Sequence, residues 1–379
     1  LGASFNAWST KEKLSTTNED VIRDALTTAP NLPVKNPDGS WAGATTVEFG
    51  SNAQYAPRNP IAMASIIKNY LDRDGILGGA YAELKPMKYL TLRVSFDGNK
   101  DSKLAYTYTP EFFFGLNNNN PQATLFMEPG RNYYWNFNQL ARYERNLGKT
   151  GRHWIGAMVS HEAQEWGYKG TPSMYNMVTK NRSGIPYKGS GALESYLGRI
   201  NYSFDDKYIL QAAIRADGSA NFTEENRWGY FPSASVAWRV SKEKFLQDVT
   251  WLNELKLRAE YGATGNPYQS GIYTAYRPTW TAFDTAYRVG NFGNPDLTWE
   301  LTKTANFGIN LNMFRNRVQI EADVFDRTTD NLLYRNDGLP AYLGTTGSGG
   351  IGAPIVNFGS LKTKGFAITV NTVNIDNRA

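Results

Sequence analysis

The segment that decides the fold is YLGRINYSFDDKYILQAAIR, residues 196–215. Apolar and polar side chains alternate along 196–204 and again along 208–215, and Asp205-Asp206-Lys207 lies between the two runs. Successive side chains of a β-strand point to opposite faces, so one face is apolar and the other carries polar residues such as Arg199 and Asn201. The sequence therefore predicts a β-hairpin with one side against an apolar medium and the other against water.

The same pattern repeats outward from this hairpin. Residues 301–313 and 318–324 alternate in the same way around Phe314-Arg315-Asn316. We expect further strands over 78–84, 88–98, 131–146, 152–162, 229–241, 253–263 and 362–375, with Lys85-Pro86-Met87 as one of the turns. With the strand that begins the chain, this gives about twelve strands joined as hairpins.

The connections alternate between short turns and long segments. The long ones are expected at 10–77, 99–130, 163–193, 218–228, 264–298 and 329–361, and the first should hold two short helices, after Thr17 and after Asn59-Pro60. Short turns at one end and long loops at the other are typical of transmembrane β-barrels. A ten-residue strand tilted by ~45° spans about 23 Å, which suits an apolar band of about 25 Å. The predicted fold is an all-β, transmembrane, antiparallel up-and-down β-barrel with long extracellular loops.

The composition argues against several classes of function. The chain has 379 residues, a mean hydropathy of -0.49 and no cysteine, which excludes disulfide and thiol chemistry. A dispersed net charge of +5 argues against nucleic acid as a partner. Aromatic residues make up 14%, as girdles at bilayer interfaces would require. The chain begins inside an expected strand without an initiating Met, so we expect residues 1–379 to be an interior piece of a longer protein.

Signals for catalysis are weak. His161-Glu162-Ala163-Gln164-Glu165 is only superficially similar to a zinc-protease motif, because Glu165 replaces the second histidine and the segment is not helical. Gly347, Gly349 and Gly352 have dinucleotide-motif spacing but no strand and helix around them, and Glu224-Glu225 is best interpreted as a solvated turn. We predict no catalytic residue, no metal and no cofactor.

Signals for binding come from aromatic side chains in the expected loops. Flat rings stack on sugar faces or hold peptide side chains, and loops on a rigid scaffold are common recognition sites. The alternative is that most of these rings pack the loops against one another. The candidate substrate-binding residues are Trp41, Tyr106, Tyr108, Phe113, Trp166, Tyr168, Trp228, Tyr276, Trp280 and Tyr287.

An ordered set of motifs carries a family resemblance over nearly the whole chain. These are DVIR (20–23), NPDGS (36–40), LESYLGRINY (193–202), RADGS (215–219), WGYFPS (228–233), AWR (237–239), LKLRA (255–259), YGATGN (261–266), NPDLTWE (294–300) and DVFDR (323–327). Together they resemble the barrel of SusC/RagA-like TonB-dependent transporters of the Gram-negative outer membrane.

The resemblance implies a 22-stranded barrel with an N-terminal plug, of which residues 1–379 would be the central barrel part. The plug, the TonB-binding segment and the terminal strands would be absent from this stretch. It further implies energised import of oligosaccharides or peptides without covalent chemistry, a SusD-like surface lipoprotein that caps the barrel, and TonB-ExbB-ExbD as the energy source. Outer-membrane lipid would surround it.

Two other classes stay open from the sequence. One is a passive outer-membrane porin or adhesin barrel, which would have no plug encoded upstream. The other is a soluble β-rich glycan-binding protein or glycosidase. That class requires the apolar residues, Ile200, Leu210, Ile309 and Ile320 among them, to face a dry protein interior.

Overall fold

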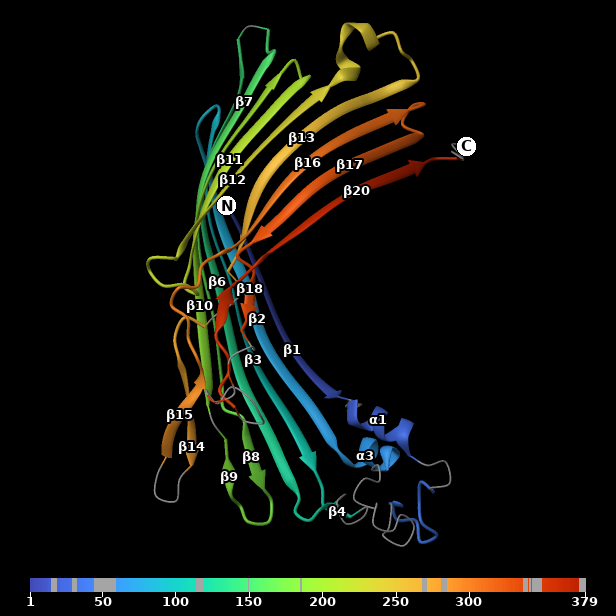
Figure 1. The fold of residues 1–379 in the computed structure, drawn as a ribbon, viewed down its shortest axis with the longest axis vertical. Helices are drawn as coiled ribbons and strands as arrows, with labels where there is room; N and C mark the ends of the chain where they lie inside the picture. The colour runs from blue at the N-terminus through green and yellow to red at the C-terminus, as the bar shows by residue number, and fades with distance from the viewer. Residues whose placement is uncertain are drawn as a thin grey trace.

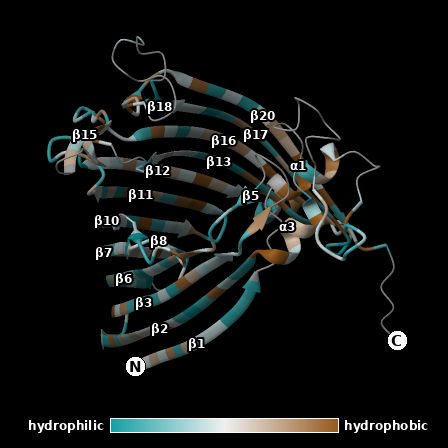
Figure 2. Cartoon of the chain, turned by 90° about the horizontal axis from the view of Figure 1, so that it is seen from below, coloured by the Kyte–Doolittle hydropathy of each residue, from teal (hydrophilic) through white to brown (hydrophobic). Residues whose placement is uncertain are grey.

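The chain folds into one long antiparallel sheet that curves into an open arc. The structure is a computed structural model, and it describes residues 1–14, 19–28, 33–43, 59–113, 119–148, 150–184, 186–267, 271–280, 285–336, 340, 342 and 350–374. The strands lie side by side from β1 (Gly2–Leu14) at one edge to β20 (Ser360–Thr372) at the other (Figure 1). Seen from below, the arc is convex on the side of β7, β10 and β11, and β1 and β20 are its two ends (Figure 2).

Strand order in the sheet is strand order in the chain. Between the two edges lie β2 (Lys68–Met87), β3 (Leu90–Thr109), β6 (Thr124–Leu147), β7 (His153–Gly170), β10 (Tyr187–Phe204), β11 (Tyr208–Ser219), β12 (Trp228–Arg239), β13 (Leu252–Asn266), β16 (Glu300–Met313) and β17 (Val318–Asp330). Off this path, β8 (Ser173–Asn176) pairs with β6 and with β9 (Arg182–Ser183). The prediction of an all-β antiparallel sheet of about twelve strands is confirmed.

Two of the predicted tight turns have the backbone that hairpins favour. Asp205 and Asp206 both have φ of 53°, and the N–H of Lys207 donates to the carbonyl of Phe204 at 2.9 Å. Two consecutive positive φ values match the twist of the flanking strands. Phe314-Arg315-Asn316 also turns with positive φ. The turn expected at residues 85–87 is wrong by a few residues, because β2 continues through a register shift to Met87 and the chain reverses at 88–89.

The strands are longer than predicted, and the long connections correspondingly shorter. β2 and β3 have 20 residues each and β6 has 24, while β11 and β12 have 12. At ~3.3 Å per residue a tilted 20-residue strand rises well beyond an apolar band of about 25 Å. Beyond the band both faces meet water, so the hydropathy alternation fades although the backbone pairing continues. This is why the pattern underestimated the strands.

The first connection contains the two expected helices. They are α1 (Glu19–Thr27) and α3 (Pro60–Ile66), and both lie near the end of the arc that carries the long connections (Figure 1). Asn59 caps α3, since its side-chain oxygen accepts from the N–H of Ala62 at 3.0 Å and Pro60 follows at N1. Thr17, expected before the first helix, lies outside the described residues.

Short elements complete the other connections. Three two-stranded pairs are β4 (Phe112–Phe113) with β5 (Asn119–Asn120), β14 (Ala275–Trp280) with β15 (Thr285–Asn291), and β18 (Leu333–Arg335) with β19 (Ile355–Asn357). At the opposite end of the sheet, β12 and β13 are joined through the 3₁₀ turns η2 (Val240–Lys242) and η3 (Lys244–Leu246). The two ends of the sheet are therefore built differently, as the predicted alternation of connections requires.

Candidate functional site

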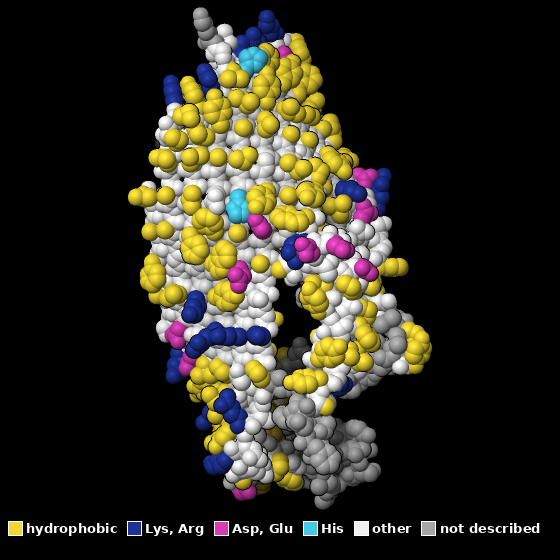
Figure 3. Space-filling model, turned by 90° about the vertical axis from the view of Figure 1, so that its left-hand side faces the viewer, with side chains coloured by type: hydrophobic (Ala, Val, Ile, Leu, Met, Phe, Trp, Pro, Cys, Tyr) yellow, Lys and Arg dark blue, Asp and Glu magenta, His cyan; other side chains and the backbone are white. Residues whose placement is uncertain are grey.

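The convex face of the sheet is apolar and uncovered. Register places Leu210, Val236, Phe307, Val324 and Phe366 in one row across β11 to β20. Between 47% and 76% of each of these five side chains is exposed. Figure 3 shows hydrophobic side chains spread over this face, with few charges among them. Folded soluble proteins rarely expose a contiguous apolar patch of this extent, so the face requires an apolar covering.

The residues on which the soluble alternative depended do not enter a dry interior. Ile200, Leu210 and Ile309 are 56%, 47% and 36% exposed, and Ile320 is partly exposed in the same set of positions on β17. Of the ten buried hydrophobic residues among the described ones, six form two small clusters near the long-connection end, and the other four are in neither cluster. The sheet thus lacks the apolar core that a soluble sandwich would build between two layers.

The concave face carries a network of charge-assisted hydrogen bonds. Arg258 on β13 donates from Nη2 to Asp323 Oδ2 on β17 at 2.7 Å, and from Nε to Asn310 Oδ1 on β16 at 3.1 Å. Asn306 Nδ2 donates to the other oxygen of Asp323 at 3.0 Å. The Arg–Asp pair crosses directly over Gly308, where a Cβ would lie 2.5 Å from Arg258 Nε. Glycine leaves the space that this pair occupies.

A second polar cluster lies at the centre of the concave face. Arg215 Nε donates to Asp217 Oδ1 at 2.7 Å, Arg215 Nη2 donates to Ser195 Oγ at 2.9 Å, and Glu162 lies 3.6 Å from Nη2. Ser195 and Asp217 are buried. The members come from β7, β10 and β11, so the cluster ties three strands together with side chains that a watery lumen tolerates.

Toward the long-connection end of the sheet, apolar side chains pack the connections against the concave face. Phe222, Phe231, Leu297 and Trp299 are buried together, with ring centroids of Trp299 at 5.2 Å from Phe222 and 5.3 Å from Phe231. Trp299 Nε1 donates to the carbonyl of Arg227 at 3.1 Å. This cluster brings the predicted motifs 228–233 and 294–300 together and packs the connections 220–227 and 292–299 against the sheet; we call this packed region the ledge.

Two of the predicted binding aromatics lie together on the concave side of β7. Trp166 and Tyr168 share the face of Gln164, and their rings lie over Gly191 and Gly189 of β10, where a Cβ would come within 2.5 Å of either ring. Glycine opposite an aromatic lets the ring lie flat on the sheet. Tyr187, which the sequence reasoning missed, is next to Tyr168 at 6.1 Å between centroids and donates to Glu128 at 2.9 Å. Its signal was Tyr187 followed by glycine at alternate positions, Gly189 and Gly191.

The other predicted aromatics whose side chains are described lie elsewhere. Tyr106 and Tyr108 lie in β3, not in a loop, and alternation puts them on the convex side, where Tyr106 stacks on Tyr70 at 5.0 Å. Trp228 begins β12 on the convex side and lies 6.0 Å from Tyr196. Trp41 packs against α3. Elsewhere, Phe113, Tyr276 and Tyr287 are exposed in β4, β14 and β15, and the side chain of Trp280 lies outside the described ones.

Histidines and carboxylates do not gather into a metal site in the part of the chain that is described. His161 faces outward on β7, where Nε2 lies 3.3 Å from Glu194 Oε1 and its ring lies against Tyr196. Glu224 and Glu225 are exposed, and Gly347 and Gly349 lie outside the described residues. No described helix is both long and apolar enough to span a bilayer.

The short-turn end carries ion pairs outside the apolar band. Arg152 donates to both oxygens of Asp205, at 2.6 and 2.5 Å, and these hydrogen bonds lower the pKa of that carboxyl. Hydrogen bonds from Lys242, with Arg239 close by, likewise lower the pKa of Asp206. Both carboxylates remain charged at neutral pH and tie adjacent hairpin ends together.

Comparison with known proteins shows which family has this architecture. The family model "TonB dependent receptor-like, beta-barrel" matches residues 15–374. A TonB-dependent receptor of Formosa agariphila is 29% identical over 93% of this chain and 36% of its own length. The TonB-dependent receptor SusC of Bacteroides thetaiotaomicron is 28% identical over 92% of this chain and 37% of its own length. The chain therefore spans just over a third of these relatives.

The structural comparison agrees. The solved structure of the RagAB peptide transporter superposes with a TM-score of 0.74 at 22% identity, over 85% of this chain and 36% of that one. At this identity the likeness concerns the fold alone, an arc of consecutive antiparallel hairpins. With the family model covering almost the whole chain, residues 1–379 belong to the TonB-dependent receptor β-barrel family.

Proposed function

We propose that this chain is the central barrel wall of an active importer that takes up oligosaccharides or peptides across a Gram-negative outer membrane. The observation that supports the proposal most is the inverted polarity of the sheet. Its apolar face is exposed on the convex side, and its charged network lies on the concave side. A membrane barrel with a watery lumen has this arrangement.

In this proposal the two sides of the wall have separate tasks. The convex face contacts lipid, and the concave face lines the passage. The rings of Trp166 and Tyr168 lie flat near the long-connection end, where cargo would enter, and offer faces for sugar rings or peptide side chains. The role involves no covalent chemistry.

The partners are proposed by analogy with the relatives. SusC of Bacteroides thetaiotaomicron is a TonB-dependent receptor, and RagAB is a peptide transporter. By analogy, a SusD-like surface lipoprotein would cover the long-connection end of this barrel, and TonB-ExbB-ExbD would act through a segment outside residues 1–379. The exposed aromatics of the long connections, Phe113, Tyr276 and Tyr287, would then face that lipoprotein or the cargo.

Uptake by a strain that lacks the full-length receptor tests this function. We expect the strain to lose growth on particular oligosaccharides or peptides supplied as the single nutrient, and to regain it with the wild-type gene only while TonB is present. Uptake that continues without TonB would mean a passive porin. The intact protein should also need detergent for extraction and migrate differently in gels before and after boiling.

A pair of variants tests the concave site within that assay. Trp166→Ala with Tyr168→Ala should weaken cargo binding by about tenfold for each ring that contacts it. The matched control is Tyr106→Ala with Tyr108→Ala, which removes two rings from the convex side of β3, two strands away from β7 in the sheet. Equal losses in both pairs would remove Trp166 and Tyr168 from the site.

A further inference from the structure

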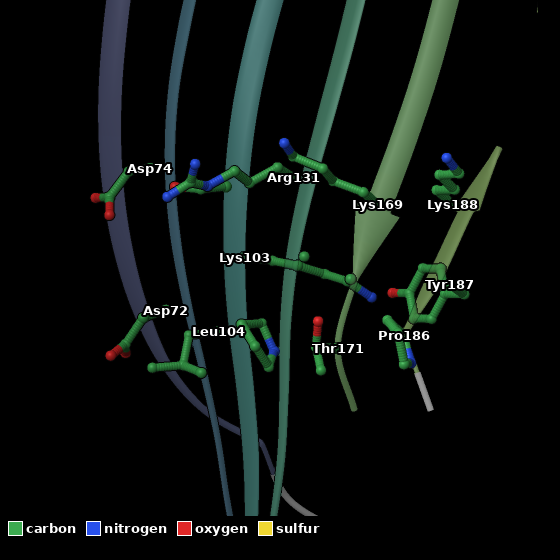
Figure 4. A pocket seen from close by; sticks show the side chains of 14 residues that line it. Asp72, Asp74, Lys103, Leu104, Arg131, Lys169, Thr171, Pro186, Tyr187 and Lys188 are labelled. Carbon is green, nitrogen blue, oxygen red and sulfur yellow. The ribbon is translucent and has the colours of Figure 1, made fainter. Parts of the chain in front are cut away.

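Three cations lie directly opposite one another on neighbouring strands of the convex face. Register pairs Arg131 of β6 with Lys169 of β7, and Lys169 with Lys188 of β10. Figure 4 shows the three side chains on adjacent strands along one pocket, with Asp74 two strands from Arg131. All three are exposed, and Lys100 of β3 joins them on the neighbouring stretch of the same face. We call Arg131, Lys169 and Lys188 the basic row.

The basic row is not neutralised by the sheet itself. Like charges in directly opposed positions destabilise a β-sheet. No member forms an ion pair within 4.0 Å with another described residue. Glu165, the nearby outward carboxylate on β7, accepts instead from Tyr133 at 2.6 Å. By contrast Lys103, on the concave side of β3, is paired with Glu128 at 3.1 Å. Asp72 and Asp74 line the same pocket, but the basic row forms no ion pair with them, so it keeps positive charge that external anions can neutralise.

The position of the row points to the source of those anions. Along the outward positions of β6, apolar and aromatic side chains, interrupted by Gln139, run from Tyr143 to Tyr133, and Arg131 is the next outward residue. Figure 3 shows Lys and Arg side chains gathered below the apolar area of this face. Aromatic side chains mark the membrane interface, so the row falls at the level of lipid headgroups on the long-connection side.

We infer that the basic row binds the phosphate groups of anionic lipids in the outer leaflet. The inference rests on the proposed membrane location of the barrel. Neighbouring strands lie ~4.8 Å apart, so three cations extend over about 10 Å, enough to contact more than one phosphate of a headgroup. Guanidinium and ammonium groups both donate charge-assisted hydrogen bonds to phosphate oxygens. The lipid so held would form an ordered patch against β6, β7 and β10.

Lipid binding by the intact receptor tests this inference. The full-length protein is reconstituted into phosphatidylcholine nanodiscs that contain lipid A, a glycolipid with two phosphates, and bound lipid A is measured after dilution into lipid-free detergent. Each cation near an anionic surface strengthens attraction about fivefold, so R131Q/K169Q/K188Q should weaken lipid A binding by roughly a hundredfold. The control K244Q/R315Q/R317Q removes three exposed cations from the short-turn end, and should leave binding unchanged.

Each outcome decides the inference. Unchanged binding by the row variant, or equal losses in row and control variants, would overturn it. So would displacement of lipid A by inorganic phosphate alone, which would make the row a site for free phosphate. Heat-shifted gel migration shows whether each variant is folded. If the wild type fails to enter nanodiscs, the proposed membrane function fails; if it enters and transports but binds no lipid A, only this inference fails.

Discussion

The two faces of this sheet are built from the same strands but stabilised by different surroundings. On the convex side, Ile200 and the other outward apolar side chains are exposed, so their stabilisation depends on the surrounding medium. On the concave side, polar groups such as Arg258 and Asp323 satisfy one another, and the buried ledge around Trp299 is packed by protein alone. A substitution should therefore cost different amounts on the two faces, even at adjacent residues.

The largest effect is expected at the ledge. Trp299→Ala removes a buried ring that contacts Phe222 and Phe231, which should cost about 3–5 kcal/mol of local stability. Trp228→Ala, on the convex side, should cost about 1 kcal/mol because that ring is 39% exposed. Hydrogen exchange of residues 220–227 and 292–299 in the intact receptor measures the difference. Equal protection in both variants would show that the ledge is not held by its apolar contacts.

A charge in the middle of the apolar face should have the next largest effect. Ile200→Arg should destabilise the bilayer-embedded barrel by about 2–4 kcal/mol, since an arginine near the bilayer midplane must leave water. Asn201→Arg, at the adjacent residue on the concave face, is the control and should cost less than about 1 kcal/mol. Unfolding by denaturant in lipid vesicles measures both. A larger cost at Asn201 would reverse the assignment of the faces.

A substitution at Gly308 tests the hydrogen-bond network of the concave face. Gly308→Ala places a Cβ between Arg258 and Asp323, and displacing that pair should cost about 1–3 kcal/mol. Gly262→Ala is a matched control on the same face, because its Cβ would meet Ser233 at an ordinary 3.4 Å. If Arg258→Met removes the difference between the two alanine variants, the pair is its cause. If Gly308→Ala and Gly262→Ala cost the same stability in the protein that keeps Arg258, the explanation is wrong.

The smallest effect should come from acid at the short-turn end. The pKa of Asp206 is lowered in the folded state, so its ion pair stabilises the fold above the unfolded pKa of ~3.9 and is lost as pH falls through the lower folded value. The contribution should stay below about 1 kcal/mol because the pair is exposed. Comparing the pH dependence of unfolding below about pH 4 for wild type and Asp206→Asn measures it. Identical profiles would assign the pair no role in stability.

Hydropathy alternation predicted the fold well where the sheet separates two media. It identified the hairpin at 196–215 and the facing sets on β16 and β17 because apolar and polar residues there sort strictly by side. It failed along 99–109 and 163–170, where both faces of β3 and β7 meet water. Trp166 and Tyr168 were therefore assigned to a loop. The glycines opposite them were the missed signal of continued pairing.

The candidate site was harder to predict for a similar reason. The Arg258–Asp323 pair joins residues 65 positions apart through the register of three strands, and the sequence shows only a glycine among asparagines along 306–312. A glycine inside a strand often marks a close approach of other groups, but it does not say which. The basic row is equally invisible, since its members are separated by 38 and 19 positions in the chain.

The agreement of chain order with sheet order has a consequence for how the protein folds. Nearly every strand pairs with one that closely precedes or follows it, so the contact order of most hairpins is low and each can close with little loss of chain entropy. The longest separation is that of β1, which must meet β2 across residues 15–67. We expect the arc to grow hairpin by hairpin from β2 onward and to add β1 last.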